Sequence, residues 1–138
     1  ILKIKKIDLI KYDYIILPGY LIKQLPSNFV DVFINTRSFM EMNIETVNFY
    51  FSQIHRIINK TGIFYCVNRY KKKTSGDIIK FKNFPLDENW TFEISRKSFS
   101  QPLIHEALVR RVSFQNYKLR KELMRLKPYD FEFFRNLM

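Results

Sequence analysis

The 138-residue sequence lacks the features that mark several classes of protein. Its one cysteine, Cys66, cannot form an internal disulfide, which favours a reducing compartment. Its longest apolar stretches are a handful of residues, such as residues 63–67, whereas a membrane-spanning helix needs about 20. No signal peptide is visible, because lysine and isoleucine alternate at the N-terminus. We therefore expect a cytoplasmic protein that does not insert into a membrane.

Motifs for metal binding and for two common chemistries are also missing. The cysteine and the two histidines, His55 and His105, are dispersed, so no metal site is expected. There is neither a G-x-S-x-G motif nor a Walker sequence. We expect His55 on the surface of a helix, and His105 with Glu106 as a structural pair in a strand.

What the chain has in quantity is apolar, aromatic and basic side chains. It is 46% hydrophobic and 17% aromatic, which is enough to fill the core of one domain over residues 1–138. The net charge of +11 would ordinarily suggest a nucleic-acid partner. However, the preferred residues (Ile, Lys, Asn, Phe, Tyr) share A/T-rich codons, and Ala107 is the single alanine. The basic residues are scattered, and we expect the one tight run, residues 71–73, to be a solvated loop. Nucleic acid is therefore not the expected partner.

The middle of the chain has the pattern of a strand, a helix and a second strand. Residues 29–34 and 63–67 are short apolar runs typical of strands buried on both faces. Asn43 is a plausible helix N-cap, and Gly62 a plausible stop after the helix. Between them, apolar residues at helical spacing predict one buried stripe: Val47, Tyr50, Phe51, Ile54, Ile57 and Ile58. This βαβ pattern implies parallel strands in an α/β sheet.

The flanking regions are simpler or leave alternatives open. Residues 1–12 fit an edge strand or a short helix, and residues 20–25 fit a helical turn. Residues 90–94 and 103–112 predict an antiparallel pair of strands. Residues 115–126 predict an amphipathic helix.

Two polar clusters follow the predicted parallel strands, at residues 35–42 and 68–70. Ligands bind open α/β sheets at the carboxyl ends of the strands, so these clusters can face one site. Simpler explanations stand beside this one. Ser38 and Glu41 have the spacing of a capping box, Met40 and Met42 suit a core, and residues 68–69 suit an ordinary turn.

Residues 31–43, DVFINTRSFMEMN, resemble the fourth-strand motif of class I S-adenosylmethionine-dependent methyltransferases. The particular group comprises the predicted sugar O-methyltransferases of bacterial polysaccharide modification. Tyr50-Phe51, residues 62–65 and Asn68-Arg69 are also similar, and the resemblance spans roughly residues 14–112. It implies a partial Rossmann-like methyltransferase sheet, made of a βαβ unit and antiparallel terminal strands.

The resemblance also implies a function and a set of site residues. The function is transfer of a methyl group from S-adenosylmethionine to a hydroxyl of a sugar or glycan. Arg69 would suit an acidic or phosphorylated sugar. The implied residues are Glu41 for catalysis; Asn35 and Ser38 beside the cofactor; and Arg37, Met42, Asn68 and Arg69 for substrate.

The sequence departs from this family in its glycines. Such enzymes hold the cofactor with a glycine-rich turn, whereas Gly19, Gly62 and Gly76 are isolated here. The chain also begins at Ile1 rather than at a methionine. We expect the C-terminal half of a methyltransferase, inactive alone, with an exposed sheet edge that favours homo-oligomers. The alternatives are a small basic nucleic-acid-binding module and an inactive, degenerate fragment.

Overall fold

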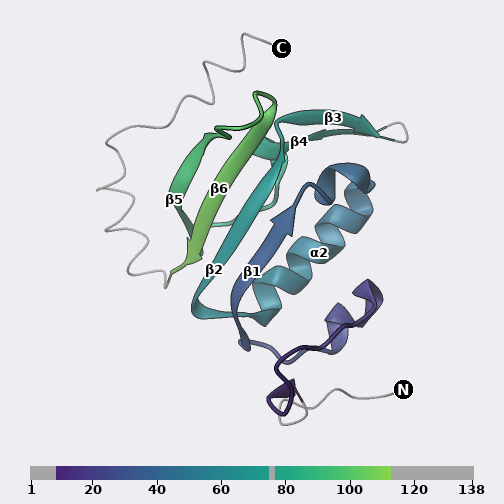
Figure 1. The fold of residues 1–138 in the computed structure, drawn as a ribbon, viewed down its shortest axis with the longest axis vertical. Coiled ribbons are helices and arrows are strands. Elements are labelled where there is room, and N and C mark those ends of the chain that lie inside the picture. Colours follow the sequence, from purple (N-terminus) through teal and green to yellow (C-terminus); the bar gives the residue numbers. More distant parts are fainter. Residues whose placement is uncertain (1–8, 75–76, 113–138) are drawn as a thin grey trace.

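The computed structural model describes residues 9–74 and 77–112, in which one helix packs against a mixed sheet (Figure 1). The sheet has the strand order β1-β2-β6-β5. β1 and β2 are parallel, and β6 pairs antiparallel with both β2 and β5. The expected α/β class is confirmed, with a βαβ unit followed by antiparallel terminal strands. The elements are β1 (Val30–Thr36), α2 (Ile44–Ile57), β2 (Ile58–Arg69), β5 (Trp90–Lys97) and β6 (Ile104–Arg111).

Two of the sequence predictions lie wholly or partly outside the described residues. The helix predicted at residues 115–126 is one of them, and most of residues 1–12 is the other. The helical turn predicted at residues 20–25 is confirmed as the short 3-10 helix η1 (Gly19–Gln24).

Helix α2 forms where its apolar stripe predicts it. The Asn43 side chain accepts a hydrogen bond from the backbone N–H of Thr46 at 2.8 Å, so Asn43 is the N-cap, as expected. Five residues of the predicted stripe are fully buried: Val47, Phe51, Ile54 and Ile57 in the helix, and Ile58 at the start of β2. The stripe therefore fixes which side of α2 packs on the sheet.

The predicted end of this helix is wrong. Helix α2 ends at Ile57 and β2 begins at Ile58, so Gly62 lies inside a strand. The register between β1 and β2 shifts at this point. A Cβ atom on Gly62 would lie 2.5 Å from Ile58 Cγ2 and 3.0 Å from the carbonyl oxygen of Asp31. Glycine is needed here because β1 approaches closely, not to stop the helix.

Strand β1 is confirmed as a parallel strand, but it is not buried on both faces. Val32 is 53% exposed and Ile34 is 61% exposed, while Asn35 on the opposite face is buried. Among the described residues β1 pairs only with β2, so it is an edge strand. An apolar run does not by itself distinguish an edge strand from a central one.

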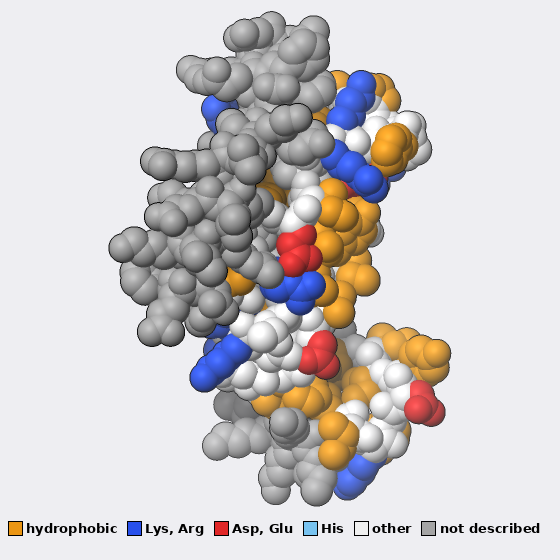
Figure 2. Space-filling view, turned by 90° about the vertical axis from the view of Figure 1, so that its left-hand side faces the viewer, with side chains coloured by type: hydrophobic (Ala, Val, Ile, Leu, Met, Phe, Trp, Pro, Cys, Tyr) orange, Lys and Arg blue, Asp and Glu red, His pale blue; other side chains and the backbone are white. Residues whose placement is uncertain are grey.

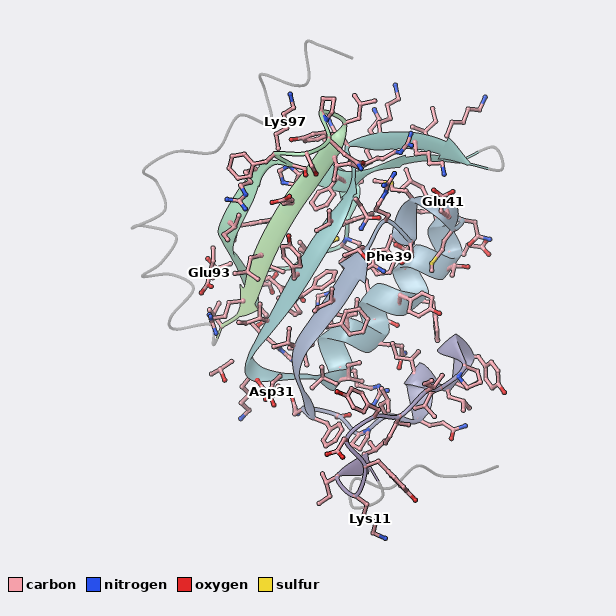
Figure 3. The ribbon with its side chains drawn as sticks, viewed as in Figure 1. Lys11, Asp31, Phe39, Glu41, Glu93 and Lys97 are labelled. Atoms are coloured by element: carbon pink, nitrogen blue, oxygen red, sulfur yellow. The ribbon has the colours of Figure 1, made fainter. Side chains whose placement is uncertain are left out.

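The core lies between α2 and one face of the sheet and is mostly aromatic. Phe39, labelled in Figure 3, belongs to the short 3-10 helix η2 (Phe39–Glu41). Its ring centroid lies 5.3 Å from that of Phe51 and 5.7 Å from that of Phe84. Met40 is buried and Met42 packs against the same core, which confirms their expected role as core residues.

The lysine run is a strand rather than the expected solvated loop. Lys71–Thr74 form β3, which pairs antiparallel with β4 (Asp77–Lys80). Ile79, opposite Lys72 in this hairpin, is 1% exposed and belongs to the core. The 3-10 helix η3 (Phe81–Asn83) follows at once and buries Phe81. These apolar anchors hold the hairpin against the domain.

Candidate functional site

The carboxyl ends of β1 and β2 lie side by side, so the two polar clusters meet as predicted. Thr36 is paired with Val67, and the backbone N–H of Arg37 donates to the carbonyl oxygen of Val67 at 2.6 Å. The parallel pairing therefore continues one residue past β1. This edge of the sheet is where α/β proteins place ligands.

A hydrogen-bonded chain of side chains joins the two strand ends. Asn68 Nδ2 donates to Asn35 Oδ1 at 2.9 Å, and Asn35 Nδ2 donates to Ser38 Oγ at 2.5 Å. Asn68 is fully buried and Asn35 is 8% exposed. Among the described residues, the buried Oδ1 of Asn68 has no hydrogen-bond partner. The two hydrogen bonds join these three residues and hold the turn after β1 against the end of β2.

Cys66 lies beside these hydrogen-bonded side chains, but its thiol is not a reactive one. Its Sγ accepts a hydrogen bond from Asn68 Nδ2 at 3.2 Å. Burial raises the pKa of the thiol to about 12, although the bond from Asn68 acts in the opposite direction. A thiol that stays protonated is a poor nucleophile.

Arg37 adopts an unusual backbone conformation in the turn after β1. Its φ angle is +63°, in the left-handed region that few residues other than glycine adopt. The bond from its N–H to Val67 and the bond between Asn35 and Ser38 hold this conformation from both sides. The Arg37 side chain is exposed. Strained residues held by their surroundings cluster at functional sites.

Glu41, labelled in Figure 3, lies at the same end of the sheet. It forms an ion pair with Lys72 of β3. Its side chain is 62% exposed. The hydrogen bond from Lys72 lowers the pKa of Glu41, and the charges of Lys72, Arg69 and Arg37 lower it further. Glu41 is therefore an ionised, exposed carboxylate in a cationic setting.

The capping-box prediction for Ser38 and Glu41 is wrong. Ser38 makes no side-chain capping bond, because its hydroxyl accepts from Asn35. The Glu41 carboxylate pairs with Lys72 instead. The long helix begins later, behind Asn43. Spacing alone suggested a cap, but long-range partners engage both side chains.

Two predicted site residues remain, and they differ in how far their side chains are exposed. Arg69 is exposed at the end of β2, close enough for its charge to act on Glu41. Met42 is half-buried against the core. Sequence reasoning missed Lys72, because the lysine run was interpreted as a loop. The signal was the Ser75-Gly76 dipeptide, which is typical of a turn in the sequence.

A second polar group lies next to Asn68 on the neighbouring strand. His105 of β6 pairs in register with Asn68 and is 4% exposed. Its Nε2 is 3.0 Å from Ser95 Oγ, and its Nδ1 is 3.0 Å from Tyr70 Oη. Burial lowers the pKa of His105 to about 4, with Glu106 acting in the opposite direction. His105 is thus neutral near pH 7, and it adds no charge to the strand ends.

His55 was expected on the surface, but it is half-buried and has two hydrogen-bond partners. Its Nδ1 accepts a hydrogen bond from Trp90 Nε1 at 2.8 Å. Its Nε2 lies 2.9 Å from the carbonyl oxygen of Pro85 and donates to it in this tautomer. Its aromatic and polar partners are distant in sequence, so its place could not be predicted from helix periodicity. Through these two hydrogen bonds, His55 holds α2 against the start of β5 and the segment before it.

No glycine-rich turn of the kind that holds a nucleotide-like cofactor is present among residues 9–74 and 77–112. Gly19 opens η1 beside Tyr50, and Gly62 lies in the bulge between β1 and β2. Neither forms a glycine-rich turn at a strand end.

Among the same described residues, no group of three or more His, Cys, Asp and Glu side chains can hold a metal ion. Nor is any helix there long and apolar enough to cross a membrane.

Comparison with known proteins gives one structural similarity. No protein-family model matches the chain, and no curated protein matches it. A solved structure that matches is described as a "putative type 11 methyltransferase from Sulfolobus solfataricus". The identity is 20% and the TM-score is 0.45, over 67% of this chain and 56% of the other. The chain thus spans little more than half of that protein, and similarity at this level does not assign an activity.

Proposed function

We propose that these residues form the C-terminal, substrate-binding half of an S-adenosylmethionine-dependent methyltransferase that acts on a sugar hydroxyl. The observation that carries the proposal is the bonded group of Asn35, Ser38 and Asn68 at the ends of two parallel strands. The resemblance of residues 31–43 to the methyltransferase motif supports the reaction type. The sugar substrate rests on that resemblance alone.

Each residue at this edge has a role suited to the reaction. S-adenosylmethionine would supply the methyl group, and the sugar oxygen would form the new bond to it while the bond to sulfur breaks. Such a displacement depends mostly on holding the oxygen in line. Glu41, being ionised, can accept a hydrogen bond from the hydroxyl and receive its proton. Asn35 and Ser38 would lie toward the cofactor, and Asn68, Arg69, Arg37 and Met42 toward the sugar.

The cofactor cradle would come from sequence outside the 138 residues. Two features support this part of the proposal. The printed sequence has three isolated glycines, and β1 has an open edge with Val32 and Ile34 exposed. A further parallel strand would cover that edge and bring a ligand-binding turn to the same end of the sheet. A second copy of the chain is the alternative partner for this edge of β1.

We further propose a cytoplasmic location.

The test is methyl transfer from labelled S-adenosylmethionine to a panel of sugars, using the protein with all of its preceding coding sequence. Glu41→Gln should lower turnover by about 100-fold, because the base is lost while the side-chain shape is kept. Glu88→Gln, a change of one exposed carboxylate in the segment before β5, is the matched control. Equal turnover in both variants would remove Glu41 from catalysis.

The competing functions give different results in the same assay. A nucleic-acid-binding module would transfer no methyl group and would bind oligonucleotides with a steep salt dependence. An inactive fragment would do neither.

A further inference from the structure

We propose that Arg37, Arg69 and Lys72 form a site for an oxyanion on the substrate, so that the sugar carries a carboxylate or a phosphate. This inference rests on the proposed function, and it names the substrate class of that site. The three residues come from the turn after β1, the end of β2 and strand β3. They meet only because the strand ends are side by side.

The local charge favours an anion. Three cationic side chains surround one carboxylate, Glu41, which leaves a net charge of +2. Among the described residues, Lys72 pairs with Glu41, whereas the guanidinium groups of Arg37 and Arg69 donate no hydrogen bond to a protein acceptor. Arginine binds carboxylates and phosphates through two parallel hydrogen bonds. Two unengaged guanidinium groups at a ligand-binding edge therefore suit an oxyanion.

The surrounding surface adds to this charge. Lys71 and Lys73, on either side of Lys72 in β3, are exposed. In Figure 2, basic side chains gather near the upper end of the molecule, the end where Figure 1 places the β3–β4 hairpin. A cationic surface attracts an anionic ligand before it reaches the two guanidinium groups.

The backbone at Arg37 is a second, independent observation. A left-handed conformation is unfavourable for a residue with a Cβ atom, because that atom comes too close to the following carbonyl oxygen. Here the cost is offset by the bonds of Asn35, Ser38 and Asn68, of which one is buried and one part-buried, and which link β1 to β2. The bonded group thus acts as a brace that presents the Arg37 side chain outward.

The experiment measures binding without S-adenosylmethionine, by calorimetry on the protein with all of its preceding coding sequence. The probes are glucose 1-phosphate, glucuronate and neutral glucose. We expect both anions to bind at least about tenfold more tightly than glucose. Arg37→Gln and Arg69→Gln should each weaken the anions by about tenfold, the usual value of a charge-assisted hydrogen bond. The phosphate and carboxylate probes separate the two sources of the oxyanion.

Three further variants complete the experiment: one matched control and two with expected changes in anion binding. Lys60→Gln removes one exposed positive charge from the opposite end of β2 and should leave binding unchanged. Glu41→Gln removes the internal counter-ion and should tighten anion binding by about threefold. Arg37→Gly should fold normally, since glycine accepts a φ of +63°, and should still lose anion binding.

Three results would overturn the inference. Equal binding of glucose and the anions would do so, as would an equal loss in Lys60→Gln and Arg37→Gln. Tight, salt-dependent oligonucleotide binding that needs Arg37 and Arg69 would also overturn it, in favour of a nucleic-acid surface. If anions bind but no sugar is methylated, the proposed function fails while the anion site stands. If neutral sugars are methylated and no anion binds, only the anion site fails.

Discussion

His105 should make the stability of the protein depend on pH between about 6.5 and 4. The ring is buried between polar and aromatic neighbours: Ser95, Tyr70 and Phe81, whose ring centroid is 4.6 Å away. Its pKa is lowered from 6.5 to about 4 by burial. The unfolded chain therefore binds a proton at a higher pH than the folded protein does.

The sign and size of the effect follow from these two pKa values. The stabilisation is complete above pH 6.5, is lost as the pH falls toward 4, and does not change further below that. A shift from 6.5 to about 4, at about 1.4 kcal/mol per unit, corresponds to about 3 kcal/mol in the free energy of unfolding. Other groups near the ring are Glu106, the adjacent residue, and Lys97, its register partner on β5.

The assay is urea unfolding at several pH values, followed by the fluorescence of Trp90, which is the only tryptophan and is buried. His105→Gln is the control, because its amide can replace the hydrogen bonds but does not titrate. Carboxylates titrate in both proteins and cancel in the difference. The wild-type protein should lose about 3 kcal/mol more than the variant between about pH 7 and pH 4. Equal losses in the two proteins would refute the assignment of a buried, neutral His105.

Three substitutions, one of them with a matched control, test the packing that positions the site. Phe51→Ala should reduce the free energy of unfolding by about 3–5 kcal/mol, because Phe51 is 1% exposed at the centre of the aromatic core. Trp90→Phe should cost about 1–3 kcal/mol, because it leaves His55 Nδ1 without its donor; far-UV circular dichroism would follow this unfolding. Gly62→Ala should cost about 1–3 kcal/mol from overpacking against backbone, whereas Gly19→Ala meets only a movable tyrosine hydroxyl and should cost less. A Gly62 variant as stable as the wild type would contradict the close approach of β1 and β2.

Features set by local periodicity could be predicted from the sequence. The spacing of Val47, Phe51, Ile54 and Ile57 located α2, and Asn43 located its start. The apolar runs on either side located the parallel strands β1 and β2. Once that crossover was recognised, the meeting of residues 35–42 with residues 68–70 followed from geometry.

Features set by contacts between distant residues could not be predicted. Ser38 and Glu41 have capping spacing, but Asn35 and Lys72 engage them instead. The same limit hid the hydrogen bond between His55 and Trp90, and the anchoring of the lysine strand through Ile79. The exposure of β1 depends on which strands lie beside it, and a single apolar run carries no information about that.

The central claim is that these residues supply the substrate side of a methyltransferase whose cofactor cradle lies in preceding sequence. Its most direct test is S-adenosylmethionine binding by calorimetry, on the 138-residue chain and on a chain extended upstream to the start codon. We predict that the extended chain binds the cofactor and that the 138-residue chain does not. Binding by neither chain would contradict the methyltransferase assignment. Binding by the 138-residue chain without its upstream sequence would contradict the proposed location of the cofactor site.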